Sequence, residues 1–130
     1  MDVDAAVSVL IETFNRWDME SFIEICTPDV QLRPIRGMLE EIEYQGHDAL
    51  REFQADAEAT WKELEFQPAG VEAREDGAVI GGFLRLRGRA SGALTERSVA
   101  IAVHMREGLV ARVAIHADGD SARRELGWQT

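Results

Sequence analysis

Apolar residues in the first half of the chain recur at the three- and four-residue spacing of helices. A first helix is predicted for residues 2–16, and Asp18 suits the N-cap of a short second helix that ends before Pro28. A third helix is predicted for residues 48–62. The apolar positions of the first and third helices are Val3, Val7, Leu10, Ile11, Phe14, Leu50, Phe53, Ala57 and Trp61.

The second half of the chain changes to the two-residue alternation of strands. After a first strand at 30–33, four strands are predicted at 66–74, 78–89, 94–106 and 109–118, separated by turn residues rich in glycine. Residues 35–46 fit neither pattern and are interpreted as a loop. A short capped helix is predicted for 120–127.

This order of elements predicts the fold class. Helices followed by a run of strands are typical of an α+β fold with an antiparallel sheet, and the helices must cover one face of that sheet. A length of 130 residues favours a single domain spanning residues 1–130.

Composition excludes several classes of partner. The formal net charge of −10 argues against nucleic acid and against anionic membrane surfaces. The first ten residues lack a basic start and a long apolar run, so neither a signal peptide nor a membrane span is predicted, and a cytoplasmic location is expected. Cys26 lies among apolar residues and is interpreted as a small buried hydrophobic side chain.

Several short motifs together resemble the SnoaL-like branch of the nuclear transport factor 2-like superfamily. They are Phe14-Asn15-Arg16-x-Asp18, Pro28-Asp29-Val30, Tyr44-x-Gly46-His47, Arg51-Glu52-Phe53, Arg85-Leu86-Arg87-Gly88-Arg89 with Ser91-Gly92, and Arg106-x-Gly108. The resemblance implies a cone-shaped curved sheet whose concave face is closed by about three helices around one pocket. The family includes ketosteroid isomerases, polyketide cyclases, dehydratases and proteins without enzymatic activity.

The faces of the strands indicate what the pocket contains. Pro34, Ile101 and Ile115 occupy positions close to those where, by resemblance, the enzymes of the family carry an acid, and all three are apolar. A three-residue turn at 106–108 would pair odd with odd positions, so that Ile101 and Val103 share the concave face with Ile115. The sequence therefore departs from the isomerase pattern and favours binding of a mostly apolar small molecule.

Candidate ligand-binding residues are taken from this face and from the helices, and no catalytic residue is assigned. They are Phe14, Trp17, Leu32, Tyr44, Phe53, Trp61, Leu84, Ile101, Val103, Ile115, His116 and Asp118. One alternative is a cofactor-free isomerase, cyclase or dehydratase in which Tyr44, His116 and Asp118 transfer protons from the rim. A ligand-free dimerisation module is a second alternative.

Neither a metal nor a cofactor is predicted, because His47, His104 and His116 lack a zinc spacing and no nucleotide-binding motif is present.

A homodimer is expected through the convex face of the sheet, where small residues would let another sheet approach. These residues are Ser98, Ala100, Ala102 and Ala114. Arg85, Arg87 and Arg89 form a stripe that is either a charged surface paired with glutamates or an anion site. Gly81-Gly82 inside a strand indicates a bulge or a close backbone approach.

Overall fold

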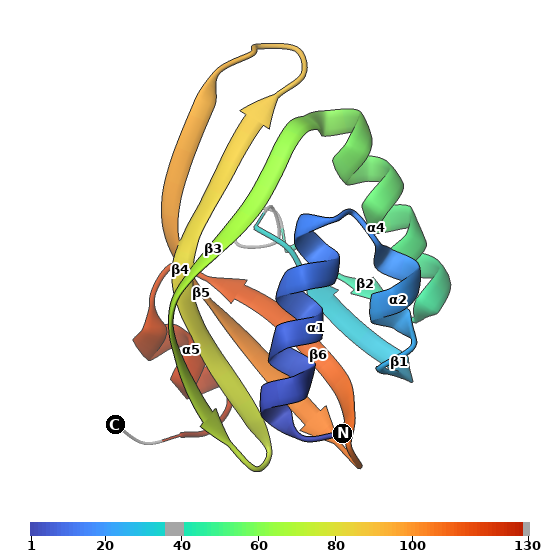
Figure 1. The fold of residues 1–130 in the computed structure, drawn as a ribbon, viewed down its shortest axis with the longest axis vertical. Coiled ribbons are helices and arrows are strands. Elements are labelled where there is room, and N and C mark those ends of the chain that lie inside the picture. Colours follow the sequence, from blue (N-terminus) through green and yellow to red (C-terminus); the bar gives the residue numbers. More distant parts are fainter. Residues whose placement is uncertain (36–40, 129–130) are drawn as a thin grey trace.

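The computed structural model describes residues 1–35 and 41–128, which form a curved six-stranded sheet with helices on both faces (Figure 1). The order of strands is β2-β1-β6-β5-β4-β3. The helices are α1 (Val3–Asn15), α2 (Met19–Ile23), α4 (His47–Thr60) and α5 (Gly119–Glu125). The strands are β1 (Cys26–Arg33), β2 (Tyr44–Gln45), β3 (Trp61–Arg74), β4 (Gly77–Gly88), β5 (Leu94–Arg106) and β6 (Leu109–His116). The predicted α+β class is confirmed, with α1, α2 and α4 on one face of the sheet and α5 on the other.

The sheet is mixed rather than purely antiparallel, which corrects one part of the prediction. Strand β1 pairs with β6 in the parallel direction, whereas the other neighbours are antiparallel. The parallel partner also explains why β1 begins at Cys26, four residues before the predicted start. Ladder pairing extends the strand through Pro28, although proline cannot donate a backbone hydrogen bond.

The first two helices begin where the sequence indicates. Asp2 caps α1 by accepting a hydrogen bond from the amide of Ala5 at 2.8 Å, and Asp18 caps α2 by accepting from the amide of Ser21 at 3.2 Å. The third helix ends earlier than predicted, at Thr60. Trp61 has an extended backbone and pairs with Gly88, so the ladder of β3 and β4 prevails over the helical spacing of its side chain.

The hairpin between β5 and β6 differs from the prediction in a way that leaves its faces unchanged. The turn has two residues, Glu107 and Gly108, both with positive φ, instead of three. A bulge at Ala111 then shifts the pairing by one residue, so that odd-numbered residues of β5 again pair with odd-numbered residues of β6. Ile101 therefore still pairs with Ile115, as predicted.

Part of the convex face of the sheet is covered by α5 of the same chain. Ala100 and Ala102 are buried in a cluster with Val79, Ala122 and Trp128. These alanines are small because α5 and Trp128 lie on them, so the predicted role for them in a dimer contact is wrong. The homodimer itself stays a prediction.

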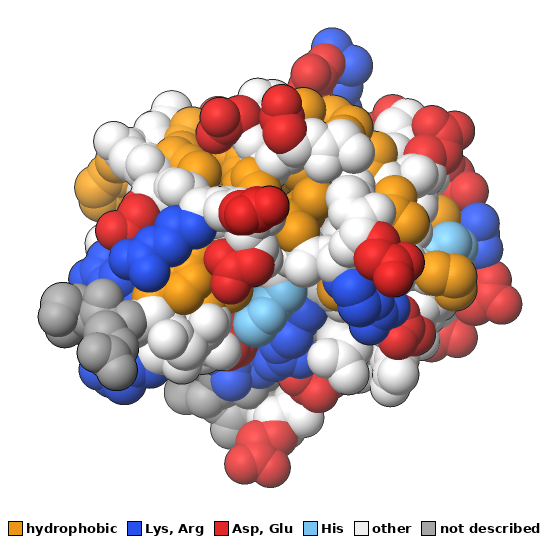
Figure 2. All heavy atoms as spheres, turned by 90° about the horizontal axis from the view of Figure 1, so that it is seen from below, with side chains coloured by type: hydrophobic (Ala, Val, Ile, Leu, Met, Phe, Trp, Pro, Cys, Tyr) orange, Lys and Arg blue, Asp and Glu red, His pale blue; other side chains and the backbone are white. Residues whose placement is uncertain are grey.

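Two of the three arginines of the predicted stripe lie near acidic side chains, whereas Arg89, just beyond β4, donates to the backbone carbonyl of Glu58. Arg85 lies 3.8 Å from Glu96, and Arg87 lies 3.4 Å from Glu63. Figure 2, which views the molecule from below, likewise shows acidic and basic side chains lying beside one another between hydrophobic ones.

In the described part of the chain, no helix has the length and apolar character needed to span a membrane.

Candidate functional site

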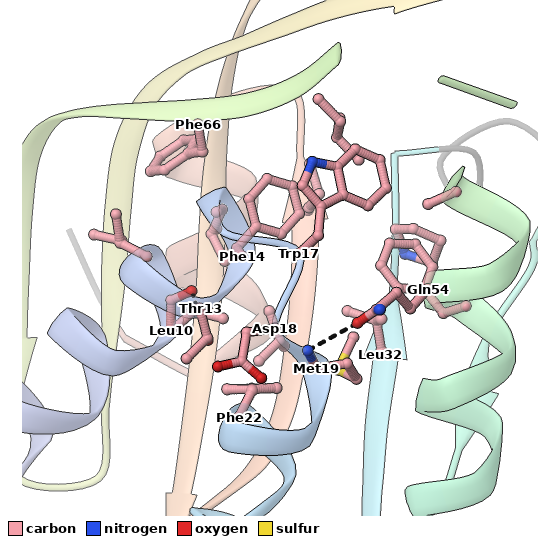
Figure 3. Close-up of a pocket in the computed structure, with 18 of the residues that line it drawn as sticks. Leu10, Thr13, Phe14, Trp17, Asp18, Met19, Phe22, Leu32, Gln54 and Phe66 are labelled. Atoms are coloured by element: carbon pink, nitrogen blue, oxygen red, sulfur yellow. Dashed lines mark hydrogen bonds between the residues drawn. The ribbon is translucent and has the colours of Figure 1, made fainter. Parts of the chain in front are cut away.

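A cavity lies between the concave face of the sheet and helices α1, α2 and α4 (Figure 3). Together with its open mouth it encloses about 810 Å³ of space between atoms. Figure 3 shows Leu10 and Phe14 on one side of this space and Leu32 and Gln54 on the other. Its lining is Leu10, Ile11, Thr13, Phe14, Trp17, Asp18, Met19, Phe22, Leu32, Pro34, Phe53, Gln54, Ala57, Leu64, Phe66, Leu84, Ile101, Val113 and Ile115. Hence almost the whole wall is apolar.

The sheet contributes to this wall because of its two-residue alternation. Leu84, Ile101 and Ile115 are buried and come from the adjacent strands β4, β5 and β6. Their neighbours along each strand point to the opposite face. Pro34 extends the wall just beyond β1. The three positions at which the resemblance implies an acid in related enzymes, Pro34, Ile101 and Ile115, thus all line the cavity with apolar side chains.

The turn between α1 and α2 places Trp17 on the wall. Trp17 has φ 58°, a left-handed conformation that costs a non-glycine residue about 1 kcal/mol. Two neighbours hold it there. Asn15 donates to the Phe66 carbonyl at 2.9 Å and accepts from the Phe66 amide at 2.8 Å, which fastens the turn to β3. On the other side, Asp18 is fixed as the cap of α2.

Polar groups enter the cavity at the junction of α2 and α4. The side-chain oxygen of Gln54 accepts a hydrogen bond from the Met19 amide at 2.8 Å, drawn dashed in Figure 3. Hydrogen bonds from the Ser21 hydroxyl and amide lower the pKa of Asp18, which keeps this carboxylate charged near neutral pH. The Gln54–Met19 bond therefore joins the two helices across one edge of an otherwise apolar space.

A second cavity adjoins the first and encloses about 500 Å³ together with its mouth. The two cavities share seven lining residues, which are Phe14, Pro34, Phe53, Ala57, Leu64, Leu84 and Ile115. The second cavity adds Tyr44, whose hydroxyl donates to Asp56 at 2.9 Å and whose ring meets Phe53 edge-on, with ring centres 5.4 Å apart. Trp61 also lines it. The pair Tyr44–Asp56 is the polar end of this cavity.

Most of the predicted ligand-binding residues line one of the two cavities. Seven line the first, namely Phe14, Trp17, Leu32, Phe53, Leu84, Ile101 and Ile115, and Tyr44 and Trp61 line the second. Val103 is fully buried in the core but lines neither cavity. Analysis of the sequence did not select Gln54 or Asp56, although both flank the predicted apolar stripe of the third helix.

The remaining two predicted residues, His116 and Asp118, lie on the other face of the sheet and hold α5. Asp118 caps α5 by accepting from the Ser121 amide at 2.7 Å, and hydrogen bonds from Ser121 lower its pKa. His116 lies 2.9 Å from Glu125 and 3.0 Å from Arg33. Of the three residues proposed for proton transfer, only Tyr44 therefore lines a cavity.

Glu125 is the centre of the contacts beneath α5. Its carboxylate lies 2.7 Å from His104 and 3.3 Å from Arg112, in addition to His116. Burial opposes ionisation, but hydrogen bonds from His104, Arg112 and His116 outweigh it and lower the pKa of Glu125 to about 2. These side chains fasten a helix, and none of them faces the cavities.

Cys26 has a structural role. Burial raises the pKa of the Cys26 thiol to about 12, so the thiol is inert, as expected from its apolar neighbours. Across residues 1–35 and 41–128, no three His, Cys, Asp or Glu side chains are grouped so that they could hold a metal ion.

Comparisons with known proteins agree with this architecture. The family model of the SnoaL-like domain matches residues 7–113. Among curated proteins, no sequence matches the chain.

Solved structures similar to the chain share its fold at low sequence identity. An NTF2-like protein of unknown function from Burkholderia pseudomallei is 18% identical, with a TM-score of 0.79 over 95% of this chain and 96% of that one. TerC, co-crystallised with polyporic acid, is 21% identical, with a TM-score of 0.76 over 95% of each chain. A protein with a ketosteroid isomerase-like fold from Catenulispora acidiphila, in complex with trimethylamine, is 9% identical, with a TM-score of 0.76 over 95% of this chain and 93% of that one.

Proposed function

The chain belongs to the SnoaL-like domain family, and from this premise we propose that it binds a small, mostly apolar molecule in the cavity between the sheet and helices α1, α2 and α4. One observation carries the proposal. The residues that line the cavity are mostly apolar, and the polar ones among them are Thr13, Asp18 and Gln54. Ligand pockets usually combine a mostly apolar lining with a few placed polar groups.

Binding is favoured over isomerase-type chemistry because of what occupies the wall. Such chemistry needs an ionisable group held in the cavity near the reacting atoms. Pro34, Ile101 and Ile115 cannot transfer a proton, and His116 lies beneath α5. The ionisable lining residues are already engaged, Asp18 by Ser21 at the start of α2 and Tyr44 and Asp56 by each other. Two structural relatives, one with polyporic acid and one with trimethylamine, add support by analogy that this fold accommodates small molecules.

A neutral apolar dye, N-phenyl-1-naphthylamine, can test the proposal by titration and fluorescence. We expect saturable binding, accompanied by a change in tryptophan emission because Trp17 and Trp61 line the cavities. Ala57 lies between both cavities and is buried, so Ala57→Phe should fill the space and weaken binding at least about tenfold.

Ala55 offers the matched control, because it lies on the same helix but is exposed. Ala55→Phe should bind the dye like the wild type. Equal binding by wild type, Ala57→Phe and Ala55→Phe would show that the dye sits elsewhere and would contradict the proposal. An absence of saturable binding to the wild type would contradict it as well.

A further inference from the structure

The second cavity has an unusual set of side chains around its polar end. Four aromatic rings line it, those of Phe14, Tyr44, Phe53 and Trp61, together with the carboxylate of Asp56. Among the described residues that line either cavity there is no lysine, arginine or histidine. Within residues 1–35 and 41–128, the charged side chains that line the cavities are negative, namely Asp56 in one cavity and Asp18 in the other.

Aromatic faces and a carboxylate together favour a particular kind of head group. The face of an aromatic ring carries partial negative charge and attracts an ammonium group, most strongly where water is displaced. A carboxylate adds an ion pair and accepts hydrogen bonds from N–H donors. An anionic head group would instead meet Asp56 with no described basic lining residue to offset it, and the net charge of −10 adds to this repulsion.

The geometry places these groups where one ligand can use both cavities. Tyr44 and Phe53 pack edge-to-face at 71°, and the hydrogen bond from Tyr44 holds Asp56 at 2.9 Å beside those rings. Phe53 and Phe14 line both cavities. A molecule with its head group at Asp56 therefore has its apolar part directed along walls that continue into the first cavity.

We propose that the second cavity recognises an organic ammonium group, so that the ligand is an amphipathic amine whose apolar body lies towards the first cavity. This inference rests on the proposed function, because it assumes that the cavities take up a small molecule. Asp56 and the rings of Tyr44, Phe53 and Trp61 are the residues that select the positive head group over a neutral or negative one.

Three probes with one apolar body and different head groups can test the inference. They are 2-naphthylmethylamine, which is a cation at pH 7, the neutral 2-naphthylmethanol and the anionic 2-naphthoate. Calorimetry or competition with the dye should give a Kd for the amine about tenfold lower than that for the alcohol, and the carboxylate should bind most weakly. Asp56→Asn should reduce the preference for the amine to about twofold and leave the Kd of the alcohol unchanged.

Glu52→Gln is the matched control, because Glu52 is an exposed carboxylate on the same helix that lines neither cavity. It should keep the tenfold preference, which separates a local effect of Asp56 from a change in net charge. Trp61→Leu should weaken the amine more than the alcohol, and thermal melts of each variant establish that it is folded.

Each other outcome has a definite meaning. If the alcohol binds as tightly as the amine, or if Asp56→Asn weakens both probes equally, the inference is wrong while the proposed function stands. If the carboxylate binds best, the inference is likewise wrong. If neither the probes nor the dye bind at millimolar concentration, both proposals fall together.

Discussion

Acid should weaken the fold, and we expect the half-buried carboxylate of Glu125 to make a large contribution to this effect. This side chain joins α5 to the sheet by contacts with His104 on β5 and with Arg112 and His116 on β6. The three contacts stabilise the ionised form only, since a protonated carboxyl cannot pair with cations in this way. The perturbations are acidification and the substitution Glu125→Gln, which keeps the size of the side chain and removes its charge.

The magnitude follows from the pKa of Glu125. Burial raises this pKa, but hydrogen bonds from His104, Arg112 and His116 bring it to about 2 in the folded chain, against an ordinary value of 4.5. The difference corresponds to about 3 kcal/mol of unfolding free energy at pH 7. Because 17% of the side chain stays exposed, solvent screening should reduce this to about 2 kcal/mol.

Folding lowers the pKa of Glu125, and this decides in which direction pH changes the stability. The contribution of Glu125 is fully present above pH 4.5 and is lost as the pH falls from 4.5 towards 2. Urea unfolding followed by circular dichroism at pH 7, 5 and 3 should show Glu125→Gln about 2 kcal/mol less stable at pH 7. The difference from the wild type should shrink at pH 3.

Glu75 provides a control, because it is an exposed glutamate in the turn between β3 and β4. Glu75→Gln should follow the wild type at all three pH values. The reasoning would be refuted by Glu125→Gln curves that run parallel to the wild type from pH 7 to 3. A Glu125→Gln variant as stable as the wild type at pH 7 would refute it too.

Three further predictions concern the sheet and its two faces. A Cβ on Gly82 would lie 2.2 Å from the Gln67 carbonyl, whereas nothing lies within 4 Å of one on Gly81, so Gly82→Ala should cost about 2 kcal/mol or more in urea unfolding and Gly81→Ala almost nothing. Asn15→Ala removes two hydrogen bonds to β3 and should cost about 2 kcal/mol by the same assay. Ala100→Arg should lower the melting temperature, because Ala100 is buried beneath α5, and light scattering of the wild type tests the expected homodimer separately.

The succession of helices and strands could be predicted because each has a clear period in the sequence. The misplaced boundaries lie where pairing with a distant strand decides the conformation. Trp61 continues the helical stripe of Phe53 and Ala57, yet its backbone pairs with Gly88. Strand β2 is only two residues long, too short to show any alternation. Much of the loop predicted at 35–46, residues 36–40, lies outside the described residues.

The apolar wall of the cavity could be predicted better than its polar edges. Alternation along β4, β5 and β6 assigns Leu84, Ile101 and Ile115 to one face, and burial of that face follows from their hydrophobicity. Asp56 is different, because a polar residue beside an apolar helical stripe has the same pattern whether it meets solvent or a cavity. Only the packing of α4 against the sheet brings Asp56 beside Tyr44.

The convex face shows a second limit of reasoning from sequence. Small side chains at Ala100 and Ala102 allow any close neighbour, and the pattern is the same for a partner subunit and for a helix of the same chain. The C-terminal helix α5 has seven residues, and only Ala122 within it is buried, so its sequence gives little sign of where it packs. Trp128, just beyond it, completes the cover.

The separation of the cavity from the histidines depends on the register of a single hairpin. Along β6, Val113 and Ile115 face the cavity, whereas Arg112 and His116 face α5. A shift of one residue would exchange these two sets, because neighbouring side chains on a strand point to opposite faces. The two-residue turn at Glu107 and Gly108 would by itself pair odd-numbered residues of β5 with even-numbered residues of β6. The extra residue at Ala111 shifts the pairing by one, so that odd-numbered residues pair with odd-numbered residues. The same strand without that bulge would bring His116 into the cavity and place Ile115 against Glu125. The bulge at Ala111 is thus what keeps His116 on the side of α5 and Ile115 in the wall of the cavity.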